Sequence, residues 1–529
     1  MNRLLLAALA AAAAMAQNSV EGTVVNEKTG LPLRRAHVVL KPAQAGADAI
    51  GIDTDDRGAF MIRDVPEGRY SIAASRDGYL ASADCLIGTL RLPRPFAVDA
   101  KVSLTGLQFR LRPFAVMAGR IAFDDGEPAI GVSVQAFREY RNRLRHGYNV
   151  AGRATTNDRG EYRIFGLASG SYLVAAIYES PAAANETLRD PPALRSTTTY
   201  FTHTIKLGEA SAVRLDYGQE VAGIDIFLER VRKVTVRGRV LSGTTGATLA
   251  VRMSLQQIDG HGVGSMLLTV PFSYDKDNQF EIRDVTPGPY LLWAEGTENG
   301  KPVAGHIPLT VGPFDIGDAE LTVQGDHPGR AVLVLDANVT LAQPPAMRFE
   351  PRNGRAKIVT AQESADGFQF SLTGGEIYDV FVDNLPNNYY LSAVRLNGAD
   401  MMPFGIDGNV ASLDRPLEIV LDSRGGVVTG RVLGTDNTLW SRASLALIPN
   451  PPTGRVQSYR EGAADENGVF TIHGVPPGTY IVLAWLDEPP CELYDPDNLP
   501  ACRAAGTAVE VGQASQQNIE LRMKSPTRR

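Results

Sequence analysis

Apolar and polar residues alternate along most of this chain, and one stretch of this alternation recurs with fixed spacing. In its first occurrence, apolar side chains stand two apart at Phe60 and Ile62, and again from Tyr70 to Ala74. Residues two apart share one face of a β-strand, whereas a helix would require spacings of three and four. The pattern therefore predicts two strands that face one core, joined by a turn at 64–69.

The same seven positions recur in four places without a gap. The columns are Phe60, Tyr162, Phe280 and Phe470; Ile62, Ile164, Ile282 and Ile472; Val65, Leu167, Val285 and Val475; Gly68, Gly170, Gly288 and Gly478; Tyr70, Tyr172, Tyr290 and Tyr480; Ile72, Val174, Leu292 and Val482; Ala74, Ala176, Ala294 and Ala484. Agreement over so many columns is not a chance event, so the chain contains internal repeats.

Two residues before each aromatic lies a residue that tolerates positive φ, and five before it lies Asp or Asn. The first column holds Gly58, Gly160, Asn278 and Gly468, and the second holds Asp55, Asn157, Asp275 and Asp465. Asp or Asn that opens a turn, with Gly or Asn closing it, is ordinary hairpin chemistry. The alternative is a calcium loop. The sequence lacks the bidentate Glu that a calcium loop requires at its end, so the pattern favours structural turns.

A glycine flanked by apolar residues opens each repeat, at Gly22, Gly119, Gly238 and Gly430. The interval between the last two leaves room for a further, altered unit near 325–423, in which the columns fray by a residue. We therefore expect five repeats, numbered 1 to 5: 18–113, 114–231, 232–324, 325–423 and 424–524. The extra length of repeat 2 lies in 179–200, which reads as a surface loop.

Strands every 8–12 residues with turns between them favour a β-sandwich. Each repeat is large enough to bury a core of its own. We expect an all-β protein, a tandem array of about five Greek-key β-sandwich domains.

The N-terminus has the features of a secretory signal peptide. Arg3 precedes an apolar run, and Ala14-Met15-Ala16 offers a small-x-small cleavage site. The run is too short to span a bilayer, and the alternative is a buried N-terminal helix. We therefore expect a signal peptide at 1–16, cleavage near Ala16, no transmembrane segment after cleavage, and a protein that is secreted or lies in the periplasm or cell envelope.

The chain has three cysteines and a net charge of −7. Cys491 and Cys502 bracket a Pro- and Asp-rich loop, and we expect them to form a disulfide; the alternative is two free thiols. Cys85 is expected to be a buried small apolar residue. The charge, with no cluster of Lys and Arg, argues against binding of nucleic acid.

Repeat 1 resembles the carboxypeptidase regulatory-like domain, a transthyretin-like or prealbumin-like fold. The resemblance rests on Val20-Glu-Gly-Thr-Val, Gly30-Leu-Pro32, Thr54-Asp-Asp-Arg-Gly58-Ala-Phe60, Val65-Pro-Glu-Gly68-Arg-Tyr70 and Gly78-Tyr79. Repeats 2, 3 and 5 keep the second half of this signature. Repeat 4 is similar through Leu385-Pro386 and Tyr389-Tyr390. The chain thus resembles bacterial proteins built from several such domains, which also resemble carbohydrate-binding-like folds.

The resemblance does not imply catalysis. The zinc site of a metallocarboxypeptidase needs a His-x-x-Glu pair, and none of the seven histidines is followed by Glu three residues later. No motif of a zinc protease, serine hydrolase or phosphate-binding loop occurs. We therefore expect no catalytic residues, no metal and no cofactor.

Two hypotheses about function remain. In the first, the chain is an exported, non-enzymatic array that binds a polysaccharide, a cell surface or a partner protein. In the second, it is an accessory or non-catalytic relative of a peptidase or glycosidase with an unrecognised site. Trp293, Trp440 and Trp485 are candidates for sugar-stacking platforms, but Trp293 and Trp485 lie beside core strands, which favours their burial. The sequence does not identify the binding residues.

Overall fold

The computed structural model describes most of the chain from Asn18 to Met523. The described residues are 18–44, 46–82, 85–88, 90–92, 95–99, 103–141, 146–178, 195–196, 198–258, 265–268, 272–335, 341, 343–352, 356–409, 415–434, 439–440, 442–452, 455–486, 489–491, 493–494 and 499–523. The expected signal peptide, most of the 179–200 loop and part of the loop between Cys491 and Cys502 lie outside them.

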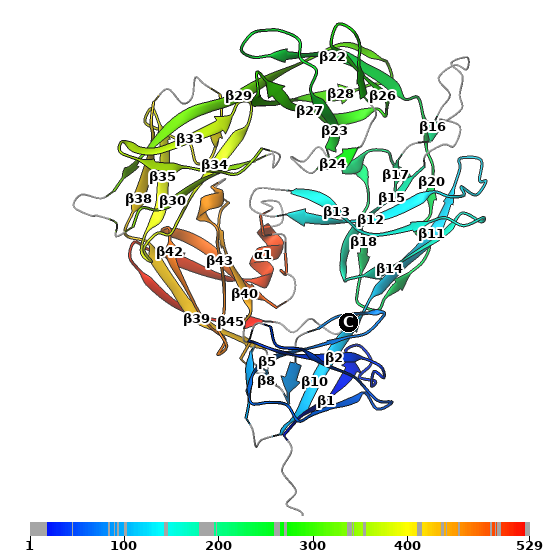
Figure 1. Ribbon diagram of the computed structural model, residues 1–529, viewed down its shortest axis with the longest axis vertical. Coiled ribbons are helices and arrows are strands. Elements are labelled where there is room, and N and C mark those ends of the chain that lie inside the picture. Colours follow the sequence, from blue (N-terminus) through cyan, green and yellow to red (C-terminus); the bar gives the residue numbers. More distant parts are fainter. Residues whose placement is uncertain are drawn as a thin grey trace, which may run out of the picture. The chain divides into compact units, whose positions relative to one another are not determined.

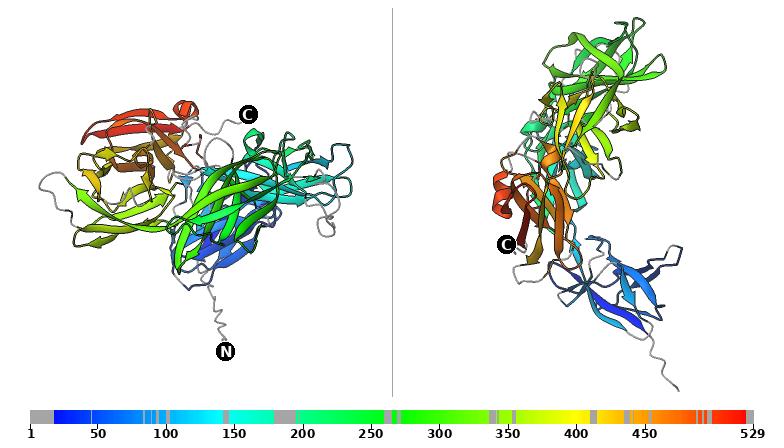
Figure 2. Two further views of the ribbon diagram at one scale, coloured as in Figure 1. Left: turned by 90° about the horizontal axis from the view of Figure 1, so that it is seen from above. Right: turned by 90° about the vertical axis from the view of Figure 1, so that its left-hand side faces the viewer.

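Contacts divide the chain into two compact units. One consists of Met1–Met117 with Phe165–Gly170 and Leu215–Val221, and the other holds Ala118–Ile164, Ser171–Arg214 and Ala222–Arg529. Both are built from strands (Figures 1 and 2), which confirms the predicted all-β, β-sandwich fold class.

Repeat 1 contains two sheets, with strand orders β4-β1-β10-β7-β8 and β3-β2-β5-β9. Their strands are β1 (Ser19–Asn26), β2 (His37–Pro42), β3 (Ile50–Asp53), β4 (Ala59–Arg63), β5 (Gly68–Ser75), β6 (Tyr79–Leu80), β7 (Cys85–Ile87), β8 (Leu90–Arg91), β9 (Phe96–Val98) and β10 (Leu104–Pro113). The first strand pairs in parallel with the last, β1 with β10, and antiparallel with β4. Residues Val20, Phe60, Tyr70 and Phe109 lie in the core between the sheets, as does Cys85.

In repeat 2 the apolar face of one sheet is covered by a segment from the same repeat. Its elements are β11 (Ala115–Ala122), β12 (Ser133–Arg141), β13 (His146–Thr155), β14 (Glu161–Leu167), β15 (Gly170–Ile177), β16 (Arg195–Ser196), β17 (Thr199–Tyr200), the 3-10 helix η2 (Leu207–Glu209), β18 (Val213–Leu215), β19 (Glu220–Val221), β20 (Ile226–Phe227) and β21 (Arg230–Val231). Tyr200 and Leu207 pack on Phe137 and Leu173. Because this second cluster buries the outer face of β15 as well, the apolar residues of β15 are consecutive and do not alternate with polar ones.

Repeats 3 and 4 share one long strand, β29 (Ile316–Val334), which crosses the expected boundary at 324. The other strands are β22 (Val234–Ser242), β23 (Arg252–Ile258), β24 (Ser265–Leu268), β25 (Phe272–Tyr274), β26 (Gln279–Val285), β27 (Gly288–Glu298), β28 (Lys301–Val311), β30 (Ala346–Pro351), β31 (Val359–Thr360), β32 (Gln362–Ser364), β33 (Gly367–Thr373), β34 (Ile377–Asp383), β35 (Tyr390–Leu396), β36 (Ala399–Asp400), β37 (Ile406–Asp407) and β38 (Leu417–Asp422). The first half of β29 pairs in parallel with β22, and the second half pairs in parallel with β38.

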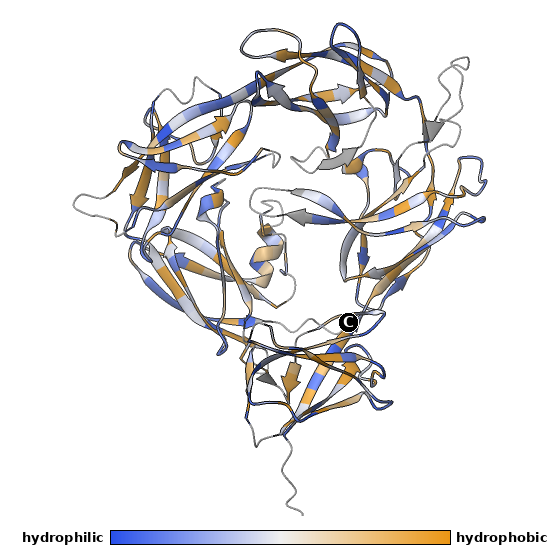
Figure 3. Ribbon diagram, in the orientation of Figure 1, coloured by the Kyte–Doolittle hydropathy of each residue, from blue (hydrophilic) through white to orange (hydrophobic). Residues whose placement is uncertain are grey.

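Repeat 5 has sheets of order β42-β39-β45 and β41-β40-β43-β44. Its elements are β39 (Gly426–Gly434), β40 (Ser444–Pro449), the 3-10 helix η4 (Val456–Ser458), β41 (Arg460–Ala463), β42 (Val469–Val475), β43 (Gly478–Trp485), α1 (Leu499–Ala505), β44 (Thr507–Val511) and β45 (Gln516–Met523). Figure 3 shows hydrophobic and hydrophilic positions alternating along many of these strands, as a sheet with one buried face requires.

The opening glycine of each repeat is explained by the parallel last strand. A Cβ atom built on Gly430 would lie 1.9 Å from the carbonyl oxygen of Ile519, and one on Gly238 would lie 1.9 Å from that of Ala319. A Cβ atom on Gly22 would lie 2.3 Å from the carbonyl oxygen of Leu107 on β10, and one on Gly119 would lie 2.1 Å from that of Ile224, just before β20. These positions exclude any larger residue because two backbones approach each other there.

The register of repeat 4 corrects one detail of its sequence alignment. Pro351 pairs with Tyr378, as Pro42 pairs with Tyr70 and Pro449 with Tyr480. Tyr378, and not the Tyr389-Tyr390 pair, therefore occupies the position of the conserved column tyrosine. The segment between Phe370 and Tyr378 is two residues shorter than its counterparts, which is why the columns fray there.

Within the described part of the chain, no helix has the length and apolar character needed to cross a bilayer.

Candidate functional site

The four predicted turn residues have positive φ. The angles are 69° at Gly58, 73° at Gly160, 56° at Asn278 and 68° at Gly468. The acidic column caps the same turns. The Oδ1 atom of Asp55 accepts hydrogen bonds from the backbone N–H groups of Arg57 and Ala59, at 2.9 and 2.8 Å. Asn157, Asp275 and Asp465 accept from the residues two and four positions later in the same way.

This geometry assigns the acidic column a structural role, since each side-chain oxygen is directed at its own turn. Among the described residues, no group of three or more His, Cys, Asp or Glu side chains is arranged to hold a metal ion. The turn interpretation accounts for the hydrogen bonds that the Oδ1 atoms of these four residues accept.

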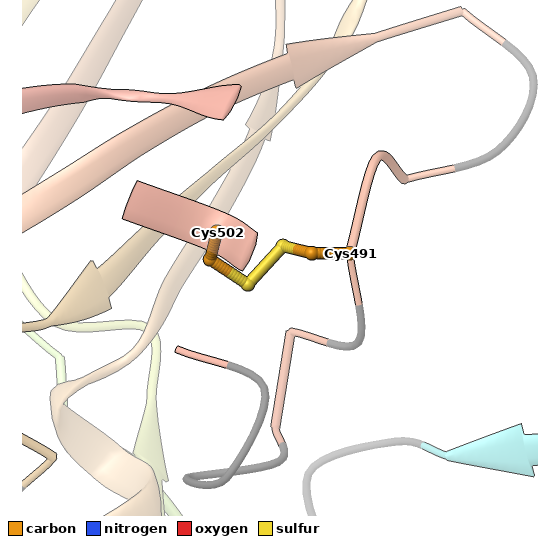
Figure 4. Close-up of a disulfide and its surroundings, with 2 residues drawn as sticks. All are labelled: Cys491 and Cys502. Atoms are coloured by element: carbon orange, nitrogen blue, oxygen red, sulfur yellow. A yellow bond between two sulfur atoms is a disulfide. The ribbon is translucent and has the colours of Figure 1, made fainter. Parts of the chain in front are cut away.

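Cys491 and Cys502 form a disulfide, and Cys502 lies on helix α1 (Figure 4). Both sulfur-bearing residues are buried with Ile481, Leu483 and Leu499. The bond therefore holds α1 over the outer face of β40 and β43, the face that an internal segment also covers in repeat 2. Cys85 is buried in repeat 1 and forms no disulfide.

None of the three tryptophans presents an open platform by itself. Trp293 is only 2 % exposed, and its indole stacks on the imidazole of His306 with ring centroids 5.0 Å apart. Trp440 and Trp485 are half-buried against the two apolar clusters of repeat 5. The expectation of burial was therefore correct for Trp293, and sugar stacking there is excluded by lack of access.

A shallow trough lies on the outer face of the β4-β1-β10 sheet of repeat 1. It has a volume of about 780 Å³ and is open to solvent. Its polar lining consists of Glu21, Thr23, Asp53, Asp55, Arg63 and Gln108, and its apolar lining includes Ile52 and Met61. These side chains come from the neighbouring strands β4, β1 and β10, from the end of β3 in the other sheet, and from the turn that follows β3, so the trough depends on the pairing of β1 with both β4 and β10.

Several polar groups of the trough already have partners. Asp53 contacts His37, with Oδ1 2.8 Å from Nδ1, and Gln108 accepts a hydrogen bond from Arg110. Ser19 donates to Glu21. The guanidinium Nε of Arg63 lies 3.1 Å from the sulfur of Met61, which is 40 % exposed. Three carboxylates against one guanidinium make the trough acidic, and Ile52 and Met61 add apolar surface to its lining.

The sequence predicted which faces of these strands are exposed but not this trough. Alternation identifies the outward side chains of one strand, whereas the trough depends on which strands are neighbours. The parallel placement of β10 beside β1 is the part that local pattern does not determine.

Residues 19–111 match the family model of the carboxypeptidase regulatory-like domain. This match coincides with the two sheets of repeat 1 and confirms the resemblance drawn from its sequence. No curated protein shows a significant sequence match to the chain.

Several solved structures match part of the chain. A streptococcal ancillary pilin is 12 % identical over 58 % of this chain and 98 % of its own, with a TM-score of 0.19. The minor pilin GBS52 of Streptococcus agalactiae is 13 % identical over 40 % of this chain and 96 % of its own, with a TM-score of 0.23. The shaft pilin SpaA of Lactobacillus rhamnosus GG is 12 % identical over 40 % and 98 %, with a TM-score of 0.21. With identities and TM-scores this low, these matches carry no argument about the fold or the function of this chain.

Proposed function

Taking as premise that residues 19–111 are a carboxypeptidase regulatory-like domain, we propose that the chain is an exported, non-enzymatic array of five β-sandwich repeats that acts by binding. The proposal takes the repeat bounds expected from sequence, with β29 shared by repeats 3 and 4, and removal of a signal peptide at 1–16. The observation that carries the proposal is the use of the acidic column as turn caps. These side chains, three carboxylates and one amide, recur in all four well-matched repeats, and in each of them Oδ1 accepts hydrogen bonds from backbone N–H groups.

The trough of repeat 1 is the surface through which we propose that binding occurs. Its acidic lining disfavours an anionic polymer, because like charges repel across a solvated surface. Its mixture of carboxylate, amide, hydroxyl and guanidinium groups around Met61 suits a ligand with many hydroxyl groups and an apolar face. A neutral polysaccharide has this chemistry, and linked repeats would add to its retention through effective concentration.

The binding proposal is tested with a panel of neutral and anionic polysaccharides. The purified mature chain is expected to be retained by at least one neutral polymer and by none of the anionic ones. Arg63→Ala and Gln108→Ala should each weaken retention. Arg34→Ala is the matched control, because Arg34 is an exposed arginine of the same repeat outside the trough. Equal loss in the control, or binding of anionic polymers alone, would contradict the proposal.

One observation favours the alternative, an accessory relative of a hydrolase. His37 and Asp53 form a hydrogen-bonded pair at the rim of the trough, and such pairs orient general bases in enzymes. Both side chains are more than half exposed, which leaves the imidazole solvated. A screen with peptide and glycoside substrates tests this function. Turnover that disappears in His37→Ala and persists in Arg34→Ala would replace the binding proposal.

A further inference from the structure

Glu376 is a buried carboxylate that departs from the repeat pattern. It stands two residues before Tyr378, where the other repeats have Gly68, Gly170, Gly288 and Gly478. Its side chain is 1 % exposed. A carboxylate buried to this extent destabilises a fold unless charge or hydrogen bonds compensate it, so its presence in a glycine column calls for a specific partner.

That partner belongs to the preceding repeat. The Oε1 atom of Glu376 lies 3.3 Å from Nδ1 of His306, which is on β28 of repeat 3. At this distance the imidazole and the carboxylate contact each other directly. Neither carboxylate oxygen meets the geometry of a hydrogen bond to a described residue, and the imidazole of His306 is the basic group that lies against this carboxylate.

His306 is itself held in place from repeat 3. Its ring lies parallel to the indole of Trp293 on β27, with 8° between the planes. The carboxylate therefore meets an imidazole whose orientation is fixed by its own repeat. The backbone around Glu376 is fixed within repeat 4: the N–H of Gly374 donates to the carbonyl oxygen of Gly325, and that of Gly408 donates to the carbonyl oxygen of Glu376.

Two other junctions between consecutive repeats also hold a buried polar side chain. Gln257 of repeat 3 accepts from the hydroxyl of Tyr200 and donates to the carbonyl oxygen of Ile205, both in repeat 2. Gln457 of repeat 5 donates to the carbonyl oxygen of Val380 in repeat 4. Gln257 pairs with Tyr290 where repeats 1, 4 and 5 have proline, so it too departs from the columns at a junction.

We propose that the contact of the Glu376 carboxylate with His306 couples repeat 4 to repeat 3. Because of this contact, β28 of repeat 3 and residues 373–379 of repeat 4 open together when the structure fluctuates. This goes beyond the proposed binding function, because it concerns how motion is transmitted along the chain and does not depend on any ligand.

Hydrogen exchange of the full-length mature chain, followed by mass spectrometry, tests the coupling. Glu376→Gly restores the residue that the other four repeats have, so repeat 4 should keep its fold. Exchange should rise at least about tenfold in β28 of repeat 3 and in 373–379, because a tenfold change corresponds to about 1.4 kcal/mol of opening free energy. Exchange in β30, within repeat 4, should stay low. Glu363→Gly is the matched control, since Glu363 is an exposed glutamate of the same repeat.

A second pair of variants keeps the test independent of the effect of glycine. His306→Phe retains an aromatic ring beside Trp293 but leaves the carboxylate of Glu376 uncompensated, so β28 should exchange faster than in Glu376→Gly. The double variant His306→Phe with Glu376→Gln removes the buried charge and should recover protection relative to His306→Phe alone. Unchanged exchange of β28 in Glu376→Gly, the same rise in Glu363→Gly, or no recovery in the double variant would each overturn the proposal.

Discussion

The hydroxyl of Tyr480 donates a hydrogen bond to the carbonyl oxygen of Pro476, four residues earlier in the chain, over 2.8 Å. The same contact recurs from Tyr70 to Pro66 at 2.9 Å and from Tyr290 to Thr286 at 2.7 Å. In each case the ring lies in the core and the hydroxyl closes the turn that precedes its own strand. The tyrosine column therefore links the packing of the sandwich to the geometry of its most regular turn.

Removal of this hydroxyl should weaken repeat 5 without changing its fold. Tyr480→Phe keeps the buried ring but leaves the Pro476 carbonyl without its donor, at an expected cost of about 1 kcal/mol. Urea unfolding of the full chain, followed by a probe in repeat 5 such as Trp485 fluorescence, measures the change. Tyr217→Phe is a control outside the column and should shift the repeat 5 transition by much less.

Repeat 5 should also lose stability at alkaline pH through the same residue. Burial raises the pKa of Tyr480 from 10.0 to about 12. Both states are protonated below pH 10, so the contribution is fully present there. Above pH 10 the unfolded chain loses its proton first, and stability falls as pH rises toward the folded pKa, by roughly 1–3 kcal/mol. Unfolding midpoints at pH 8 and pH 11 should differ more in the wild-type chain than in Tyr480→Phe; an equal difference would contradict the assignment.

The close approach of the first and last strands of repeat 5 leaves no room for a side chain at Gly430. Gly430→Ala places a Cβ atom 1.9 Å from the carbonyl oxygen of Ile519, so the parallel pairing of β39 with β45 must separate. We expect a loss of about 1–3 kcal/mol or more. Gly512→Ala in the same repeat is the control, because its Cβ would meet ordinary contacts at 3.7 Å. Similar melting temperatures for the two variants would show that the strands can adjust.

Substitutions at Gly468 and Asn278, which occupy the same turn position in different repeats, should have different effects on stability. Gly468→Val forces a β-branched residue to a φ of 68°, which should destabilise repeat 5 by about 1–3 kcal/mol. Asn278→Gly should be neutral or slightly stabilising, since glycine adopts the φ of 56° found there without strain. Thermal unfolding with and without calcium checks both points. A rise of several degrees at sub-millimolar calcium would support metal binding at these turns instead.

The disulfide should stabilise repeat 5 chiefly by restricting its unfolded chain. Cys491 and Cys502 are 11 residues apart, and closure of a loop of this length contributes about 3 kcal/mol in the chain-entropy model. Reduction should lower the unfolding midpoint of repeat 5 by a corresponding amount. The chain with Cys491→Ser and Cys502→Ser should start from the lower midpoint and not respond to reductant.

The repeat columns were sufficient to predict the all-β sandwich class. They also predicted the two strands on either side of the turn that precedes each column tyrosine. Their success has a physical cause: Phe60 and Tyr70 are buried in one core at positions that local spacing determines. Repeat 4 was harder, because the shorter segment before Tyr378 shifts the columns. Neither the trough nor the contact of Glu376 with His306 could be predicted, since both depend on which segments distant in sequence lie side by side. The signal that the sequence did offer for this contact was Glu376 itself, a glutamate at a position where the other repeats have glycine.

The continuous strand β29 bears on how this chain could be rearranged, by recombination or by design. Its first half completes a sheet of repeat 3 and its second half opens repeat 4, within a single run from Ile316 to Val334. A cut at residue 324 would leave each half of β29 with the sheet to which it pairs, but it would divide one continuous strand. Exchange of repeat 4 should therefore succeed only when the incoming unit begins with residues that continue this strand in register, because the two repeats are joined by a strand and not by a loop.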